Sequence, residues 1–182
     1  LNAAQKRAAL VTHIGNVTSY YGADCYAWDV VNEAITDNGG AQDIFKKTDW
    51  YPDVKDYVDL AFKTARQNAP KSVKLFYNDY NIGGGGTKSD RTYNMVKSMK
   101  QRGIPIDGVG LQMHIAVSYS AVDGLIANMK RLAALGLEVH ITELDIKCVP
   151  QGSSEPCTPS KLNAQARKYN SCSNYSNYGK YE

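Results

Sequence analysis

The sequence predicts an α/β fold in which four parallel strands alternate with flanking helices. Short apolar runs typical of buried strands are separated by longer segments whose apolar residues recur at helical spacing. Strands separated by helices of about 10 to 15 residues form parallel βαβ units. The 182 residues are enough for one domain with its own core, whereas a closed eight-stranded barrel typically needs about 250. The fold is therefore either a small open sheet or part of a larger barrel.

The first element is a helix over residues 2–20, where apolar residues recur with a helical period and Gly22 ends the run. The expected elements then follow in chain order: strand 25–32, helix 53–68, strand 73–77, helix 87–103, strand 108–112, a helix around 122–132, strand 137–144 and a helix starting near residue 161. Thr87 and Asp90 resemble a capping box at the start of their helix. Gly136 is the expected C-cap of the helix before the last strand.

Composition argues against several classes of partner. The net charge is +3, from 21 basic and 18 acidic residues, and no basic stripe alternates with aromatic residues, so we expect no nucleic-acid partner. No apolar run approaches the roughly 20 residues of a membrane span, so we expect no membrane partner. The glycine run 83–86 precedes Thr87 rather than the Lys-Ser/Thr pair of a phosphate loop, and is read as a flexible connection.

Cysteine and histidine spacing predicts no metal site. The four cysteines form no C-x-x-C pair, and the three histidines show no ligand spacing. Cys148 and Cys157 flank a loop rich in proline, glycine and serine that could close as a disulfide, although two free thiols remain the alternative. A disulfide would fit a secreted, extracellular protein.

Polar side chains follow every predicted strand, and two of them are glutamates. Glu33 and Glu143 each end an apolar run, and the carboxyl ends of parallel barrel strands are where active sites form. The other members of this constellation are Asn32, Asn78, Tyr80, Gln112, His114 and Asp145. One buried glutamate is often a structural ion-pair member, but two at matching strand ends suggest hydrolysis of a glycosidic bond.

Strand alternation predicts which side chains share a face. Gly108 and Gly110 fall on the same face as Gln112 and His114, so the glycines leave space beneath the two polar groups. The same alternation groups Glu143 with Asp145 and puts His140 on the opposite face, as a packing or surface residue. His13, on a helix, is expected to be structural.

Four motifs together resemble one known family. They are WDVVNEA at 28–34, YNDYN at 77–81, DGVGLQMH at 107–114 and ITELD at 141–145. In this order the motifs resemble those of the family-10 glycoside hydrolases, which are endo-β-1,4-xylanases. The resemblance implies a (β/α)8 TIM barrel, of which residues 1–170 would hold strands four to seven as a partial catalytic domain. Strands one to three and eight are then expected in a full-length protein. Residues 171–182 form a polar tail expected to be disordered.

The resemblance also implies roles for the strand-end residues. Glu33 matches the acid/base and Glu143 the nucleophile of a retaining double displacement on xylan or xylo-oligosaccharides, without a cofactor or metal. The matches to sugar-binding or orienting positions are Asn32, Asn78, Gln112 and His114. Asp145 and Tyr80 match supporting positions.

Three other interpretations remain open. One is a related barrel glycosidase acting on β-glucan, cellulose or mannan, and another is a non-catalytic carbohydrate-binding fragment. A phosphate- or nucleotide-binding sheet is the third and has the least support. With four strands only, the chain by itself is expected to be a weak or inactive xylanase, because a half barrel exposes strand edges and part of its interior.

Overall fold

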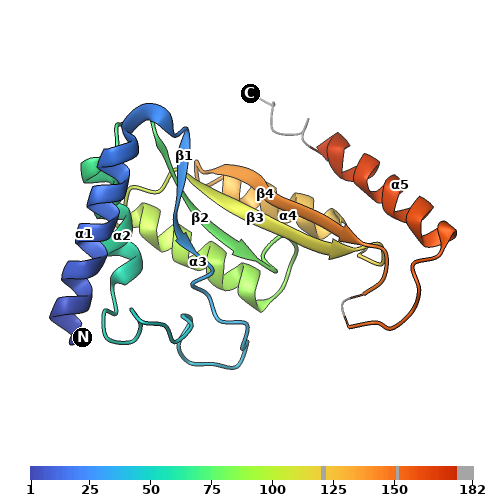
Figure 1. Cartoon of the computed structure of the whole chain (residues 1–182), viewed down its shortest axis with the longest axis horizontal. Helices are drawn as coiled ribbons and strands as arrows, with labels where there is room; N and C mark the ends of the chain where they lie inside the picture. Colours follow the sequence, from blue (N-terminus) through green and yellow to red (C-terminus); the bar gives the residue numbers. More distant parts are fainter. Residues whose placement is uncertain (120–121, 151, 176–182) are drawn as a thin grey trace.

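A computed structural model describes residues 1–119, 122–150 and 152–175, with side chains left out at 122–123 and 172–175. Four strands form one parallel sheet in sequence order, as predicted (Figure 1). The strands are β1 (Ala27–Asn32), β2 (Lys74–Tyr80), β3 (Gly108–Ala116) and β4 (Glu138–Lys147). The helices are α1 (Ala3–Tyr21), α2 (Tyr57–Asn68), α3 (Thr87–Gln101), α4 (Val122–Ala133) and α5 (Pro159–Tyr175), with a short 3-10 turn, η1 (Gly22–Asp24), after α1.

The first helix has a complete cap at each end. The Asn2 side chain accepts a hydrogen bond from the Gln5 amide and the Gln5 side chain accepts one from the Asn2 amide, which satisfies two otherwise unpaired donors. Gly22 ends the helix with φ of 49°, a left-handed conformation that glycine adopts readily.

Two helix starts differ from the sequence prediction. α2 begins at Tyr57 rather than at residue 53, because residues 51–56 form turns in which Asp53 and Asp56 pair with α1. The capping box predicted at Thr87 is wrong: Gly86 is the N-cap of α3 and provides no side-chain bond. The Asp90 carboxylate is instead 2.6 Å from Arg131 of α4, so it ties two helices together rather than capping one.

The last three strands extend three or four residues beyond their predicted carboxyl ends. β3 and β4 remain paired as far as Ala116 and Lys147, and β2 reaches Tyr80. The polar residues expected to follow these strands therefore lie within them. Ladder hydrogen bonds hold their backbones, which fixes the side-chain directions.

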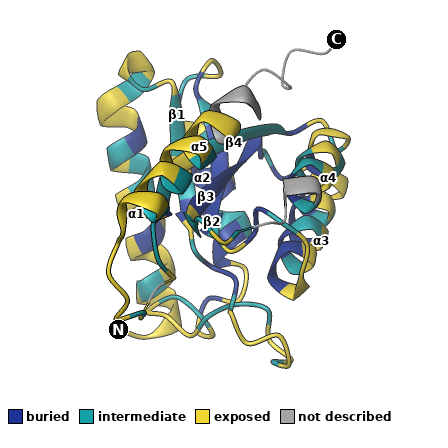
Figure 2. Cartoon of the chain, turned by 90° about the vertical axis from the view of Figure 1, so that its right-hand side faces the viewer, coloured by how far each residue is buried: buried dark blue, intermediate teal, exposed yellow. Residues whose placement is uncertain are grey.

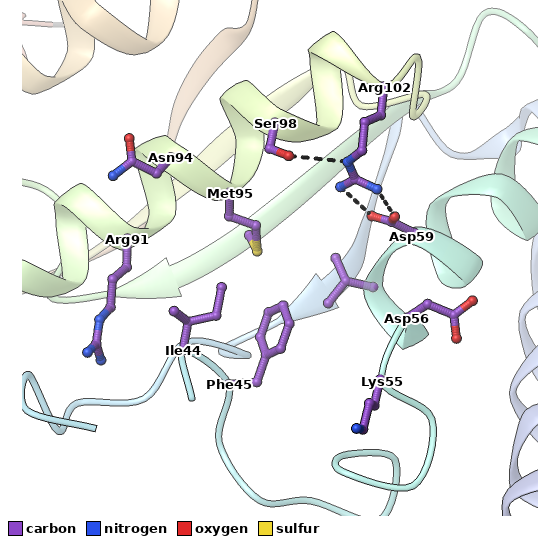
Figure 3. Close-up of a pocket in the computed structure, with 11 residues that line it drawn as sticks. Ile44, Phe45, Lys55, Asp56, Asp59, Arg91, Asn94, Met95, Ser98 and Arg102 are labelled. Carbon is purple, nitrogen blue, oxygen red and sulfur yellow. Dashed lines mark hydrogen bonds and ion pairs between the residues drawn. The ribbon is translucent and has the colours of Figure 1, made fainter. Parts of the chain in front are cut away.

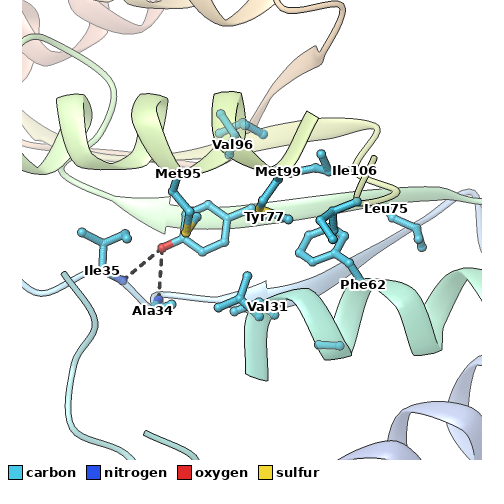
Figure 4. Packing of buried hydrophobic residues seen from close by; sticks show 14 of the residues in the cluster. Val31, Ala34, Ile35, Phe62, Leu75, Tyr77, Met95, Val96, Met99 and Ile106 are labelled. Atoms are coloured by element: carbon cyan, nitrogen blue, oxygen red, sulfur yellow. Dashed lines mark hydrogen bonds between the residues drawn. The ribbon is translucent and has the colours of Figure 1, made fainter. Parts of the chain in front are cut away.

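The main core lies on one face of the sheet. Leu75 and Tyr77 of β2 are fully buried in one cluster with Phe62 of α2 and Val96 of α3 (Figure 4). Leu111 of β3 is fully buried in the same cluster. Figure 2 shows the buried residues concentrated in the central strands and on the helix sides that face them. The opposite face of β3 carries Gly108, Gly110, Gln112 and His114, as alternation predicts, and this is the face that forms the site.

The segment after β4 is closed by the predicted disulfide, between Cys148 and Cys157. α5 lies beside β4, where the Tyr169 hydroxyl accepts a hydrogen bond from the Ile146 amide at 3.1 Å (Figure 1). The helix continues to Tyr175, so residues 171–175 differ from the disordered tail expected from residue 171. The rest of that tail, 176–182, lies outside the described residues. No helix within the described ranges is long and apolar enough to cross a bilayer.

Candidate active site

Glu33 lies immediately after β1 in an uncommon backbone conformation. Its φ is 56°, in the left-handed region that costs a non-glycine residue about 1 kcal/mol or more. The Glu33 amide donates to the Asn78 carbonyl of β2 at 2.8 Å, which holds the turn against the neighbouring strand. Backbone strain of this kind clusters at functional sites, where the surrounding structure maintains it. The left-handed conformation at Glu33 turns the chain at the edge of the sheet where the candidate residues of the other strands also lie.

Glu143 lies in β4 next to an imidazole held on both sides by carboxylates. His114 Nε2 is 3.0 Å from Glu143 Oε2, and His114 Nδ1 is 2.5 Å from Asp145 Oδ2. The register explains the contact, because Gln112 pairs with Glu143 and His114 pairs with Asp145 across the parallel ladder. His114 is therefore in hydrogen-bond contact with both Glu143 and Asp145. Asp145 orients the ring that in turn orients Glu143.

A continuous chain of hydrogen bonds joins the two glutamates. Gln112 Nε2 donates to Glu33 Oε1 and to Asn32 Oδ1, both at 3.1 Å. Asn78 Nδ2 donates to the same Asn32 oxygen at 3.1 Å and to Glu143 Oε1 at 3.3 Å. All five residues predicted at these strand ends are thus brought to one face. The two carboxyl groups are connected through these amide side chains.

The glycines of β3 make room for this network. A Cβ atom at Gly110 would lie 2.3 Å from Asn78 Oδ1, and one at Gly108 would lie 2.2 Å from the Phe76 ring. The space predicted beneath Gln112 and His114 is therefore filled by Phe76 and Asn78. Side chains at either glycine would displace the residues that support the site.

Thr142 is a site residue that sequence reasoning missed. Its hydroxyl donates to Asn78 Oδ1 at 2.7 Å, so the Asn78 amide group must turn its NH2 toward Asn32 and Glu143. Thr142 is the extra residue of a β-bulge, where the register moves from Leu111–Ile141 to Gln112–Glu143. Its position inside the ITELD motif was the available signal, but no spacing rule assigns it a role.

The same bulge corrects the prediction for His140. His140 pairs with Gly110 and therefore lies on the same face as Glu143, because the inserted residue reverses the alternation between them. Its ring packs against Phe76 with centroids 4.4 Å apart, so the packing role holds although the face was wrong. Asp29 of β1, paired with Phe76, lies on this face as well. Partial burial and then the nearby Glu143 charge raise the pKa of Asp29.

Tyr80 lies at the edge of the candidate site, on the side of Glu33. Its hydroxyl donates to Asp37 Oδ2 at 2.5 Å and accepts from Lys46 Nζ at 3.1 Å. The Lys46 ammonium is also 3.8 Å from Glu33 Oε2. Tyr80 is thus connected to Glu33 through Lys46, a residue that sequence reasoning did not select.

Two hollows differ in their relation to this site. One, of about 450 Å³, adjoins Gln112 and His114 and is walled by Gly83–Gly85, which places the glycine run beside the site. A larger one, of about 540 Å³, lies between α2 and α3 over Phe45 and Met95 (Figure 3). Its rim includes the ion pair between Arg102 and Asp59 and none of the predicted site residues. The predicted site residues therefore lie on the strand-end face and not at the larger hollow.

His114 should titrate above its ordinary pKa of 6.5. The hydrogen bond to Asp145 is the largest cause, and the charges of Asp145 and Glu143 add to it against the effect of partial burial. A pKa raised by folding means that the protonated ring stabilises the fold. This contribution is complete below about pH 6.5 and is lost as pH rises through the folded-state pKa.

An NMR titration of the His114 ring would measure this value directly, and Asp145→Asn should lower it. Urea unfolding should show the free energy falling above pH 6.5 more steeply in the unmodified chain than in Asp145→Asn. A His114 pKa at or below 6.5 would contradict the interaction.

The fold and site define a class of protein. Two glutamates on one face, at the carboxyl ends of parallel strands and linked by amide groups, form the kind of site found in barrel glycoside hydrolases. The sequence profile of glycosyl hydrolase family 10 matches residues 1–178. The chain belongs to this family, and its four-stranded sheet is part of a (β/α)8 barrel, which confirms the predicted fold.

Known proteins of similar sequence and structure support this family assignment. Endo-1,4-β-xylanase B from Neocallimastix patriciarum is 47% identical over 144 residues, which cover 76% of this chain and 16% of that protein. Exoglucanase XynX from Acetivibrio thermocellus is 40% identical over 167 residues, covering 88% and 14%. Xylanase 10B from Thermotoga petrophila, solved in complex with xylobiose, matches with a TM-score of 0.76 and 37% identity, covering 86% of this chain and 46% of that chain. The chain thus spans less than half the length of each.

Proposed function

We propose that this chain carries the catalytic pair of a retaining endo-1,4-β-xylanase, which hydrolyses internal β-1,4 bonds of xylan by double displacement. The observation that supports it most is the hydrogen-bonded chain from Glu33 through Gln112, Asn32 and Asn78 to Glu143. A retaining mechanism needs two carboxyl groups about 5 to 5.5 Å apart across the sugar. Three amide side chains join Glu33 to Glu143, which keeps both carboxyl groups at the same edge of the sheet.

In the first step, Glu143 attacks the anomeric carbon while Glu33 transfers its proton to the leaving oxygen. The glycosidic bond breaks and a glycosyl ester forms on Glu143. In the second step, Glu33 takes a proton from water, whose oxygen attacks the same carbon and releases Glu143 as a carboxylate. Both residues return to their starting states, and the two inversions retain the configuration of the sugar.

The neighbouring residues have distinct roles in this scheme. The Asn32 oxygen already accepts hydrogen bonds from Gln112 and Asn78, so the Asn32 NH2 is the group available to donate to a sugar hydroxyl. His114 and Asp145 hold the Glu143 carboxylate in one orientation. A donor that contacts the sugar more closely in the transition state raises the rate, whereas uniform binding does not.

Xylan is the favoured substrate because a relative named endo-1,4-β-xylanase matches most of the chain and a solved relative binds xylobiose. One observation favours a β-glucan or cellulose substrate as a second candidate, since an exoglucanase is also similar at 40% identity. Both substrates present β-1,4 bonds to the same pair of carboxylates.

The test compares polysaccharides on a complete barrel, made by joining this chain to strands one to three and eight of the Thermotoga petrophila enzyme. New reducing ends should form from xylan at least about tenfold faster than from β-glucan, cellulose or mannan. The chain alone should be at least about a hundredfold slower, because the sugar is not held on its other side. Faster cleavage of β-glucan would assign the second candidate. Binding to insoluble xylan without product release by the complete barrel would contradict catalysis.

We also propose that the protein is secreted. The Cys148–Cys157 disulfide supports this, since disulfides persist in oxidising compartments. Immunodetection in the producing culture should find the protein in the medium, and its retention inside cells would refute the proposal.

A further inference from the structure

The turn that carries Glu33 is held by a tyrosine on the far side of the sheet. The Tyr77 hydroxyl accepts hydrogen bonds from the amides of Ala34 and Ile35, both at 3.1 Å (Figure 4). These are the two residues directly after Glu33. Tyr77 is fully buried and belongs to the helix-facing core, so its side chain acts on this turn without facing the site.

A buried carboxylate fixes the direction of that hydroxyl. Tyr77 donates to Asp79 Oδ2 at 2.5 Å, and an ionised carboxylate can only accept. The hydroxyl proton therefore points to Asp79, which leaves both oxygen lone pairs for the two amides. The hydrogen-bonding capacity of Tyr77 is fully used. Burial, and after it the charge of Asp79, raises the pKa of Tyr77 well above its usual range. The phenol therefore keeps this proton.

Lys88 completes the arrangement and extends it along the turn. Its ammonium lies 2.9 Å from Asp79 Oδ1 and 2.9 Å from Asp37 Oδ1. Asp79 is fully buried and the Lys88 side chain is 8% exposed. Removing either residue would leave the other as an unpaired buried charge, which is strongly destabilising. The segment 33–37 is thereby fixed at two points, by Tyr77 at its start and by Lys88 at its end.

We propose that Tyr77, oriented by Asp79 and Lys88, is a positioning residue for the acid/base Glu33. The unit maintains the left-handed backbone at Glu33 and so keeps its carboxyl group aimed at the leaving oxygen. This inference rests on the proposed function and adds a residue that does not contact the substrate. It predicts that losing the Tyr77 hydroxyl impairs proton transfer specifically, rather than catalysis in general.

The test is Tyr77→Phe in the complete barrel, assayed on two substrates. An aryl xylobioside with a good leaving group needs little acid assistance, whereas xylan needs it fully. The rate on xylan should fall by about ten- to a hundredfold, the effect of misplacing a catalytic group by about 1 Å, and the rate on the aryl substrate should fall by less than about twofold. The ratio of the two rates does not depend on how much of the sample is folded, since both come from the same molecules.

Tyr57→Phe is the matched control. Tyr57 is buried in the same core, and within the described part of the chain its hydroxyl bonds no residue of the segment 33–37. This variant should leave the substrate ratio unchanged. On the chain itself, amide hydrogen exchange at Ala34 and Ile35 should accelerate at least about tenfold in Tyr77→Phe and not in Tyr57→Phe.

The outcomes distinguish the proposed acid/base role of Glu33 from the proposed positioning role of Tyr77. If Glu33→Ala shows no preference for good leaving groups, the acid/base assignment itself fails. If Glu33→Ala shows that preference and Tyr77→Phe does not, the acid/base stands and the positioning role is overturned. Equal losses on both substrates, or unchanged exchange at Ala34 and Ile35, would also overturn it.

Discussion

Replacing Glu143 by alanine should reduce xylan cleavage by the complete barrel by about 10⁵-fold or more. Loss of the nucleophile removes the covalent intermediate, and removal of a comparable nucleophile in a serine protease costs on the order of 10⁶ in kcat. Steady-state release of reducing ends measures the effect. Glu138→Ala is the matched control, because Glu138 lies on the same strand and pairs with Lys74 and His140. Within the described residues it makes no hydrogen bond or ion pair with Glu33, Glu143 or the amide groups that join them.

Azide distinguishes a missing nucleophile from a damaged fold. The small anion can enter the space left by the carboxylate and attack the anomeric carbon once, so the product should be a glycosyl azide of inverted configuration. Added azide should restore turnover on an activated aryl xylobioside in Glu143→Ala. Activity of Glu143→Ala on xylan close to that of the unmodified barrel would refute the assignment.

Replacing Glu33 by alanine should have an effect that depends on the leaving group. Acid catalysis contributes about 10²- to 10⁴-fold, so xylan cleavage should fall by that range. Formation of the glycosyl intermediate from a substrate with a good leaving group should be nearly unchanged, because that leaving oxygen needs no proton. Single-turnover measurements of leaving-group release on both substrates would separate the two effects.

Glu33→Gln serves as the control for shape. It keeps the size of the side chain and an oxygen near Gln112 but has no proton to transfer, so it should reproduce the leaving-group preference of Glu33→Ala. Equal losses on xylan and on the activated substrate in both variants would exclude Glu33 as the acid.

The strand-end residues could be predicted because they depend on local rules that the structure preserves. Apolar runs alternating with helical segments specify parallel βαβ units. Parallel strands end at one edge of the sheet, so Asn32, Asn78, Gln112, His114 and Glu143 had to meet there once the strands were recognised. The four motifs also pointed to the family that the profile match now shows.

Other features depended on contacts between segments far apart in sequence. Asp90 reads as a helix cap in the sequence, but Arg131 of α4 lies close enough to take its carboxylate. His140 was assigned to the wrong face because a bulge at Thr142 reverses the alternation, and no local pattern marks a bulge. Lys46 was not selected because its distance from Glu33 is set by the loop between β1 and α2.

The sequence by itself determined that Glu33 and Glu143, the proposed catalytic pair, lie at one edge of the sheet, since strand periodicity brings both there. Only the tertiary structure decided how those groups are held. Hydrogen-bond partners such as Thr142 for Asn78, and Tyr77 for the turn after Glu33, come from neighbouring strands. Their pairing depends on register, bulges and buried charge, and these are settled by packing of the whole sheet rather than by the residues next to them in the chain.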